Sequence, residues 1–196
     1  FGWDGRFPAP GWKSEVGWAG LLPAADNPVL IDPPAETIVT ANSFLPVPLP
    51  DWFQGEFDTA FRADRLRERL AEKSDWTPAG LAALQGDATS LWAKWLVSRL
   101  GGDHAGDAAK AWVALSGWDG AMGERGAPAL FALVERHLQR AVFQDEATAA
   151  KLARFGSRWR LIRLLDGEMS PAWFDDVATP VQENRAATID RALAAA

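Results

Sequence analysis

Several residue types that carry chemistry are absent or rare in this sequence. Cysteine and tyrosine are missing altogether, and there are only two histidines. Without cysteine the chain can form neither disulfide bonds nor thiolate metal sites, an absence that fits a periplasmic protein as well as a cytosolic one. No run approaches the eighteen apolar residues that a membrane-spanning helix needs, and a net charge of −6 argues against a nucleic-acid partner. We therefore expect neither a membrane nor a nucleic acid among the partners.

The groups that could form a catalytic or metal site by themselves are poorly placed. His104 lies between Asp103 and Asp107, but one histidine and two aspartates without a second cluster are more typical of an ordinary loop than of a metal site. His137 falls within a predicted helix, where packing is the simpler interpretation, and the acidic pair at 175–176 favours a cap or turn. No serine–histidine–acid order, glycine-rich phosphate loop or zinc spacing is present. By its residues alone, the chain carries no set of general acid, base and nucleophile.

Proline divides the sequence into two parts. Nine of the thirteen prolines lie within residues 1–54, which leaves no room there for a helix of ordinary length. The β-branched content of Glu36–Ala41 predicts a short strand that ends at Asn42. A segment this irregular cannot form its own core and must lie across other structure. We therefore expect an extended, proline-rich segment at 1–54 and a helical region at 55–196.

Tryptophan is abundant, with eleven in the chain. Each indole brings a large apolar area and one N–H that needs a partner. The tryptophans either fill the core of this chain or form surfaces that another chain covers.

Helical spacing of apolar residues and capping signals predict the elements beyond residue 55. The basic residues near the start of this region alternate with Asp64, Glu68 and Glu72, which indicates a solvated, salt-bridged helix face. A glycine, Gly86, is expected to bend or divide the second helix, and the alanine-rich C-terminus is expected to fray. The first expected helix is capped by Asp58 or Thr59 and runs to about Ala71. The others cover about 78–100, 107–115, 130–142, 147–154, 158–166 and 180–195.

Three blocks of sequence form a recognisable pattern: Gly5–Gly11 with Gly17–Pro23 and Asn27-Pro28, then Pro33–Asn42, then Phe61–Leu66 with Leu84–Ser90, and a weaker match at Trp118–Gly120. Together they resemble the penicillin acylase (penicillin amidase) family of N-terminal-nucleophile hydrolases. Several motifs in the same order and spacing are more specific than any one of them, and the resemblance is good over residues 1–120 and fainter beyond. It implies that the chain, which begins at Phe1 without a methionine or signal peptide, is an internal portion of the larger chain of a processed precursor with the αββα fold.

The resemblance implies a specific chemistry. In that family a serine at the N-terminus of the larger chain attacks an amide carbonyl to form an acyl-enzyme, with its own α-amino group as base. By position Asn42 corresponds to the asparagine that stabilises the oxyanion, and Arg62 to the arginine that orients this asparagine. Asp51 and the backbone of Gly5 correspond to calcium ligands in some members, although one carboxylate and one carbonyl are an incomplete set. The resemblance implies no organic cofactor.

The same resemblance sets the expected substrate, partners and location. The substrate is a small acyl-amide of the penicillin or N-acyl-homoserine-lactone type, and the location is the periplasm or exterior of a bacterium. The partners are the other segments of the precursor, which are the nucleophile-bearing N-terminal part and the smaller chain.

Some positions depart from the family pattern. Ser43 replaces a common second asparagine, Phe61 replaces a tyrosine, Glu36-Thr37 replaces a glycine, and Phe1 is no nucleophile. We therefore expect this chain to supply an oxyanion donor but to be inactive alone, because no covalent step is possible without a nucleophile. Two alternatives remain: a non-catalytic helical binding or scaffold module derived from the family, and a self-contained domain with a ligand surface built on tryptophans.

Overall fold

The computed structural model describes residues 8–17, 20–44, 47–50, 53, 55, 57–123, 126–145 and 157–196. Over these residues the chain is mainly helical and contains no strand, and Thr89 and Ala121 form one isolated antiparallel bridge. The chain divides into two compact units, Phe1–Ala63 and Asp64–Ala196. None of the described helices is long and apolar enough to cross a membrane.

The described part of the first unit is extended and turn-rich. Its one regular element before α1 is the short 3-10 turn η1 (Ala24–Asp26), and its backbone hydrogen bonds close turns such as Glu36 N to Pro33 O at 2.8 Å. The predicted strand at Glu36–Ala41 is wrong in this structure: among the described residues, this segment has no neighbouring strand with which to form a ladder.

Helix α1 (Phe61–Leu70) begins one to two residues later than a cap at Asp58 or Thr59 predicts. The predicted salt-bridged face is confirmed: Arg67 pairs with Asp64 at 2.7 Å, and Arg69 with Glu72 at 2.6 Å, each three residues apart. The helix predicted at about 78–100 is divided into two, which is one of the two outcomes expected from Gly86. The two pieces are α2 (Pro78–Leu84), capped by the Thr77 hydroxyl, and α3 (Leu91–Arg99), capped by the Ser90 hydroxyl.

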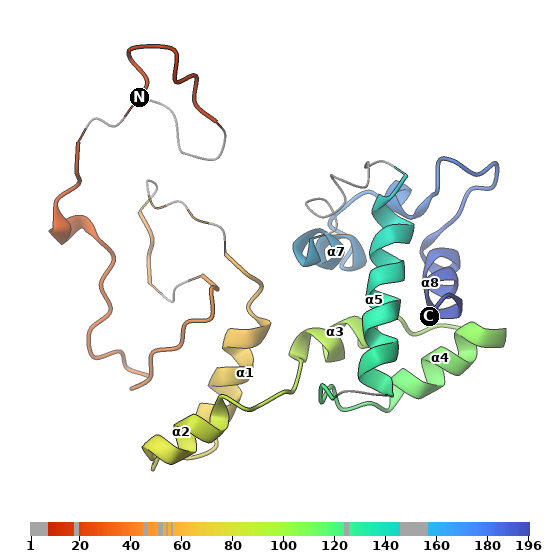
Figure 1. The fold of residues 1–196 in the computed structure, drawn as a ribbon, viewed down its shortest axis with the longest axis horizontal. Helices are drawn as coiled ribbons and strands as arrows, with labels where there is room; N and C mark the ends of the chain where they lie inside the picture. The colour runs from red at the N-terminus through yellow and green to blue at the C-terminus, as the bar shows by residue number, and fades with distance from the viewer. Residues whose placement is uncertain are drawn as a thin grey trace. The chain divides into compact units, whose positions relative to one another are not determined.

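The core of the second unit is formed by α3, which buries Trp92 and Leu96, and by the helices that follow it. These are α4 (Gly106–Ser116), α5 (Ala127–Phe143), α7 (Arg158–Leu165), the 3-10 turn η2 (Pro171–Phe174) and α8 (Arg185–Ala194). Helix α5 packs against α4 and α8, as Figure 1 shows. Its buried side chains recur at helical spacing, as predicted for 130–142. The buried apolar residues of α5 are Pro128, Phe131, Val134, Leu138, Val142 and Phe143.

Two predictions at the C-terminal end need correction. Helix α8 begins at Arg185 rather than at Pro180, because the side chain of Asn184 caps it by accepting from the Ala187 N–H at 3.1 Å. Its last turn is not frayed, since Ala192 and Leu193 are each only 1% exposed. The helix predicted at 147–154 lies outside the described residues.

The tryptophans are distributed between core and surface. Trp92 is buried, and its indole N–H donates to Glu135 on α5 at 2.9 Å. Arg158 on α7 bonds the same carboxylate at 3.0 Å and lies over the Trp92 ring, so this indole joins α3, α5 and α7. In contrast, Trp12 is 86% exposed. Core filling therefore holds for Trp92, whereas a surface that another chain covers stays a prediction for exposed tryptophans such as Trp12.

Candidate functional site

Asn42 and Arg62, twenty residues apart in sequence, are in direct contact. The Nη2 atom of Arg62 donates to Asn42 Oδ1 at 2.8 Å and to the Ala41 carbonyl at 2.8 Å. Arg62 lies in the first turn of α1, where a regular helix fixes its backbone, and Asn42 lies in the turn after the extended run 37–41. The two residues assigned by resemblance to oxyanion stabilisation and its orientation are thus brought together.

The contact determines which way the Asn42 amide faces. Because Arg62 can only donate, it selects the carbonyl oxygen of the amide, and the Nδ2 hydrogens are directed to the other side. The Asn42 backbone is left-handed, with φ of +59°, a conformation that asparagine tolerates better than most residues. The Asn42 amide is half-buried and its Nδ2 group has no hydrogen-bond acceptor among the residues that the structure describes, so it can stabilise a developing negative charge.

Asp58 is the third residue of this cluster, and the sequence did not single it out as part of a site. Its carboxylate accepts from Arg62 Nη2 at 3.1 Å and from the Thr59 N–H at 2.7 Å. Its own backbone N–H donates to the Asn42 carbonyl at 2.6 Å. The spacing of four residues to Arg62 is the one sequence signal that could have identified the pair.

Ser43, at the position where the family commonly has a second asparagine, is 6% exposed. Its hydroxyl has no hydrogen-bond partner among the described residues. The neighbour of Asn42 in sequence is therefore a packed side chain.

The other motif blocks meet in the second unit. Arg65 of the third block donates two hydrogen bonds to Asp87, from Nε to Oδ1 at 3.1 Å and from Nη2 to Oδ2 at 2.7 Å. It also donates to the Thr89 hydroxyl at 3.3 Å. Hydrogen bonds from the guanidinium hold the pKa of Asp87 at about 2, although burial opposes this shift. The same contact raises the pKa of Arg65. This pair joins α1 to the segment between α2 and α3.

The Leu84–Ser90 block is joined in turn to the Trp118–Gly120 block. The Ser90 N–H donates to the Gly120 carbonyl at 2.8 Å, and the Met122 N–H donates to the Ala88 carbonyl at 2.9 Å. Gly120 has a φ of +80°, which favours glycine. The motif residues of the second unit thus form a structural frame, in which the Ser90 hydroxyl caps α3 by accepting from the Ala93 N–H at 3.1 Å.

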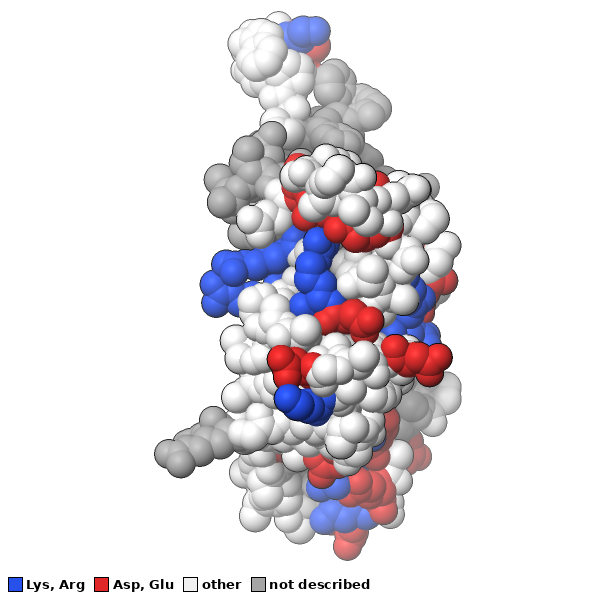
Figure 2. Space-filling model, turned by 90° about the vertical axis from the view of Figure 1, so that its right-hand side faces the viewer, with Lys and Arg blue, Asp and Glu red and all other residues white. Residues whose placement is uncertain are grey.

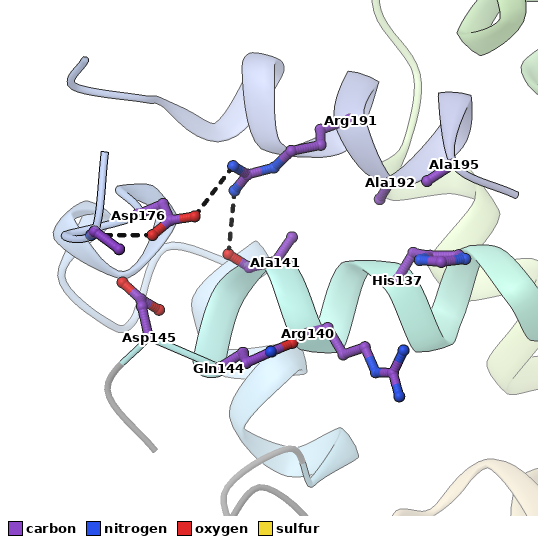
Figure 3. Close-up of a pocket in the computed structure, with 10 residues that line it drawn as sticks. His137, Arg140, Ala141, Gln144, Asp145, Asp176, Arg191, Ala192 and Ala195 are labelled. Carbon is purple, nitrogen blue, oxygen red and sulfur yellow. Dashed lines mark hydrogen bonds and ion pairs between the residues drawn. The ribbon is translucent and has the colours of Figure 1, made fainter. Parts of the chain in front are cut away.

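A separate groove of about 500 Å³ lies between α5 and α8. His137 and Arg140 line one wall, and Arg191 crosses to pair with Asp176 at 3.4 Å (Figure 3). The Asp176 carboxylate also accepts from the Ala178 N–H, and Asp175 accepts from the Glu183 N–H at 2.8 Å, so this acidic pair acts in turns, as predicted. Among the described residues that line the groove, no nucleophile is paired with a base.

On the face of the molecule drawn in Figure 2, lysine and arginine side chains are interspersed with aspartate and glutamate side chains.

His104 lies in the loop between α3 and α4, as predicted, but its side chain is buried. Its side chain is only 5% exposed, and the ring bridges Asp190 Oδ1 at 2.5 Å and the Leu100 carbonyl at 2.7 Å. The residue therefore ties the end of α3 to α8. His137 carries no such bridge and is half-buried on α5, as expected for helix packing.

The predicted calcium ligands Gly5 and Asp51 lie outside the described residues. Within the described part of the chain, no group of three or more histidine, aspartate or glutamate side chains could hold a metal ion. The calcium site stays a prediction.

The sequence of this chain is similar to known proteins of one family. The family model for penicillin amidase matches residues 2–196. A penicillin acylase 2 proenzyme from Pseudomonas sp. (strain SE83) is 35% identical over 44% of this chain and 11% of its own length. Acyl-homoserine lactone acylases QuiP from Pseudomonas fluorescens (strain Pf0-1) and Pseudomonas syringae pv. tomato are 26% and 27% identical over 98% of this chain.

The chain spans 27% and 26% of the length of those two lactone acylases. No solved structure matches it. A family model that covers nearly the whole chain is decisive, and the chain belongs to the penicillin amidase family.

Proposed function

We propose that this chain is part of an amidohydrolase that cleaves an acyl-amide through an acyl-enzyme, and that Asn42 donates a hydrogen bond to the oxyanion of the tetrahedral intermediate. The substrate is of the penicillin or N-acyl-homoserine-lactone type, as the names of the relatives suggest. The proposed parent fold is the αββα fold of N-terminal-nucleophile hydrolases. The observation that carries the proposal is the 2.8 Å hydrogen bond from Arg62 Nη2 to Asn42 Oδ1, which turns the amide donors away from the arginine.

The chemistry assigned to this chain is electrostatic. As a nucleophile from another segment adds to the amide carbonyl, the carbonyl oxygen gains negative charge, and a fixed N–H donor lowers the energy of that state more than that of the substrate. Arg62 keeps the amide from rotating and adds a positive charge on its far side. The nucleophile and its base lie on other segments of the precursor, so this chain alone is expected to be inactive.

The exposed apolar side chains of the first unit support a larger parent. Trp12 is 86%, Leu21 100% and Ile31 75% exposed, in a segment without a core of its own. A self-contained domain would bury most of such side chains, whereas a portion of a larger chain leaves them for other segments to cover. Calcium binding and a periplasmic or secreted location remain predictions from the family resemblance.

The test uses the full-length, processed protein that contains this chain. Turnover is measured on a penicillin and on an N-acyl-homoserine lactone for the wild type, for Asn42→Ala and for the control Asn27→Ala, an exposed asparagine of the same unit. Asn42→Ala is expected to lower kcat by about 10²–10³, because one oxyanion donor contributes on the order of 3 kcal/mol. The control is expected to keep wild-type kcat.

Two results would contradict the proposal. Normal turnover by Asn42→Ala would remove the oxyanion role, and turnover by the 196-residue chain alone would show that the nucleophile is within it. A full-length protein without activity on either substrate would favour the alternative of a helical binding or scaffold module.

A further inference from the structure

We propose that Asp58 is a positioning residue of the oxyanion donor, acting on Asn42 through Arg62. This inference rests on the proposed function of Asn42. It concerns a carboxylate that neither the sequence motifs nor the names of the relatives assign to the site.

The first step is the way Arg62 is held. Its side chain is 60% exposed, so packing does not fix the guanidinium. Only directed contacts can do so, and a single nitrogen, Nη2, makes all three: to the Ala41 carbonyl, to Asn42 Oδ1 and to Asp58 Oδ2. Of these acceptors, only Asp58 carries a charge, and a charge-assisted bond is stronger than a neutral one. The carboxylate therefore fixes where the guanidinium sits.

The second step is the way Asp58 itself is held. One carboxylate oxygen accepts from the Thr59 N–H at 2.7 Å, which leaves the other directed at Arg62. Thr59 is 5% exposed and so provides a packed anchor. The Asp58 N–H donates to the Asn42 carbonyl at 2.6 Å. The same residue thus bonds the backbone that carries the amide and the guanidinium that turns it.

The third step is the consequence for catalysis. An oxyanion donor is effective when it is already aimed at the position that the charge will occupy, so a small rotation of the Asn42 amide weakens it in the transition state. Loss of the Asp58 carboxylate leaves Arg62 with two neutral acceptors and a side chain free to turn into solvent. The donor remains but is less well fixed. This change should lower kcat more than it raises KM.

The experiment compares variants in the full-length processed protein. Asp58→Ala keeps the backbone hydrogen bond to Asn42 and removes only the carboxylate. For this variant we expect kcat to fall roughly 5- to 20-fold, with KM within about 2-fold of the wild-type value. Asp58→Asn, which keeps an acceptor oxygen, should recover part of this loss. Asp64→Ala is the matched control, because the Asp64 carboxylate pairs with Arg67 on α1 rather than with Arg62. It should leave kcat unchanged.

Measuring the effect of Asp58→Ala on kcat in a protein that already carries Arg62→Ala separates a structural effect from a positioning effect. If Asp58 acts through Arg62, adding Asp58→Ala to Arg62→Ala lowers kcat by less than about 2-fold more. A full additional loss there, or wild-type kcat in Asp58→Ala while Asn42→Ala is impaired, overturns the positioning role alone. Should Asp58→Ala fail to fold, Asp58→Asn replaces it in the same comparison with Arg62→Ala. An additive loss of kcat in that comparison also overturns the positioning role. Normal kcat in Asn42→Ala overturns the proposed function and this role together.

Discussion

At the scale of single residues, Asp87 gives a prediction about acid stability. The hydrogen bonds from Arg65 hold its pKa at about 2, below the ordinary value of about 3.9. A lowered pKa in the folded state means that protonation favours unfolding, so this contribution is complete above about pH 4 and is lost as the pH falls toward 2. Both side chains are mostly buried, at 13% and 24% exposed, and the shift corresponds to about 2 kcal/mol.

We therefore expect Asp87→Asn to lower the free energy of unfolding at pH 7 by about 2 kcal/mol, and the difference from wild type to shrink as the pH approaches 2. Urea titrations at a series of pH values measure both effects. Asp107→Asn is the control, because Asp107 also has a lowered pKa, from Lys110, but is exposed. Equal losses in the two variants would refute a special role for the Arg65–Asp87 pair.

Gly120 gives a second residue-scale prediction. Its φ is +80°, and a Cβ there would lie 2.7 Å from Lys94 Cγ and 3.0 Å from the Ser90 carbonyl. The lysine side chain can move, but the Ser90 carbonyl accepts from the Lys94 N–H at 3.2 Å in the first turn of α3 and cannot move without loosening that hydrogen bond. Gly120→Ala should therefore lower the free energy of unfolding by about 1–3 kcal/mol. Gly117→Ala is the control, since a Cβ at Gly117 meets nothing within 4 Å; a similar loss there would contradict the steric argument.

Sequence motifs identified Asn42 and Arg62, and the structure places them in contact. What a motif could not give is the contact of Asp58 with Asn42 or the bridge made by His104, because both depend on the path of the chain between distant residues. His104 and Asp190 are 86 positions apart, and no local pattern connects them. The sequence therefore predicted the residues of the candidate site better than the contacts that hold them.

At the scale of elements, helices were predicted well where local signals agree. Thr77 with Pro78, and the buried face of α5, both match the structure. The start of α8 was misplaced because Thr179-Pro180 is also a helix-start signal, whereas Asn184 provides the actual cap. The strand at Glu36–Ala41 failed for a different reason, since β-branched residues favour extension but a strand also needs a partner.

The His104 bridge predicts how α8 is attached. Because the buried ring contacts both the Leu100 carbonyl and Asp190, His104→Ala leaves that carbonyl without this bond and opens a space beside α8. We expect a loss of about 1–3 kcal/mol in the free energy of unfolding. Thermal unfolding followed by circular dichroism measures it. His137→Ala, which removes the other histidine without a bridge, should change stability by less than about 0.5 kcal/mol; equal effects would argue against the attachment role.

At the scale of the whole molecule, the two units differ in how they are stabilised. The second unit buries large side chains from most of its described helices, including Leu96, Leu115 and Phe143. In the first unit Val39 and Ala63 are the apolar residues that are buried among those the structure describes, and several large apolar side chains face solvent. The proline content predicted this difference, because an extended segment cannot bury both of its sides by itself.

The contrast predicts which part of the chain folds independently. A chain of residues 58–196, which keeps α1 intact, should retain the helical circular dichroism signal and a cooperative thermal transition within a few degrees of the 196-residue chain, since the helices supply their own core. It should bind less of a dye specific for exposed apolar surface, because Trp12, Leu21 and Ile31 are gone. A chain of residues 1–183 is the matched comparison: it lacks α8 and the buried Ile189 and Leu193, and should lose the cooperative transition. Loss of cooperativity in 58–196 instead would mean that the extended segment completes the helical core.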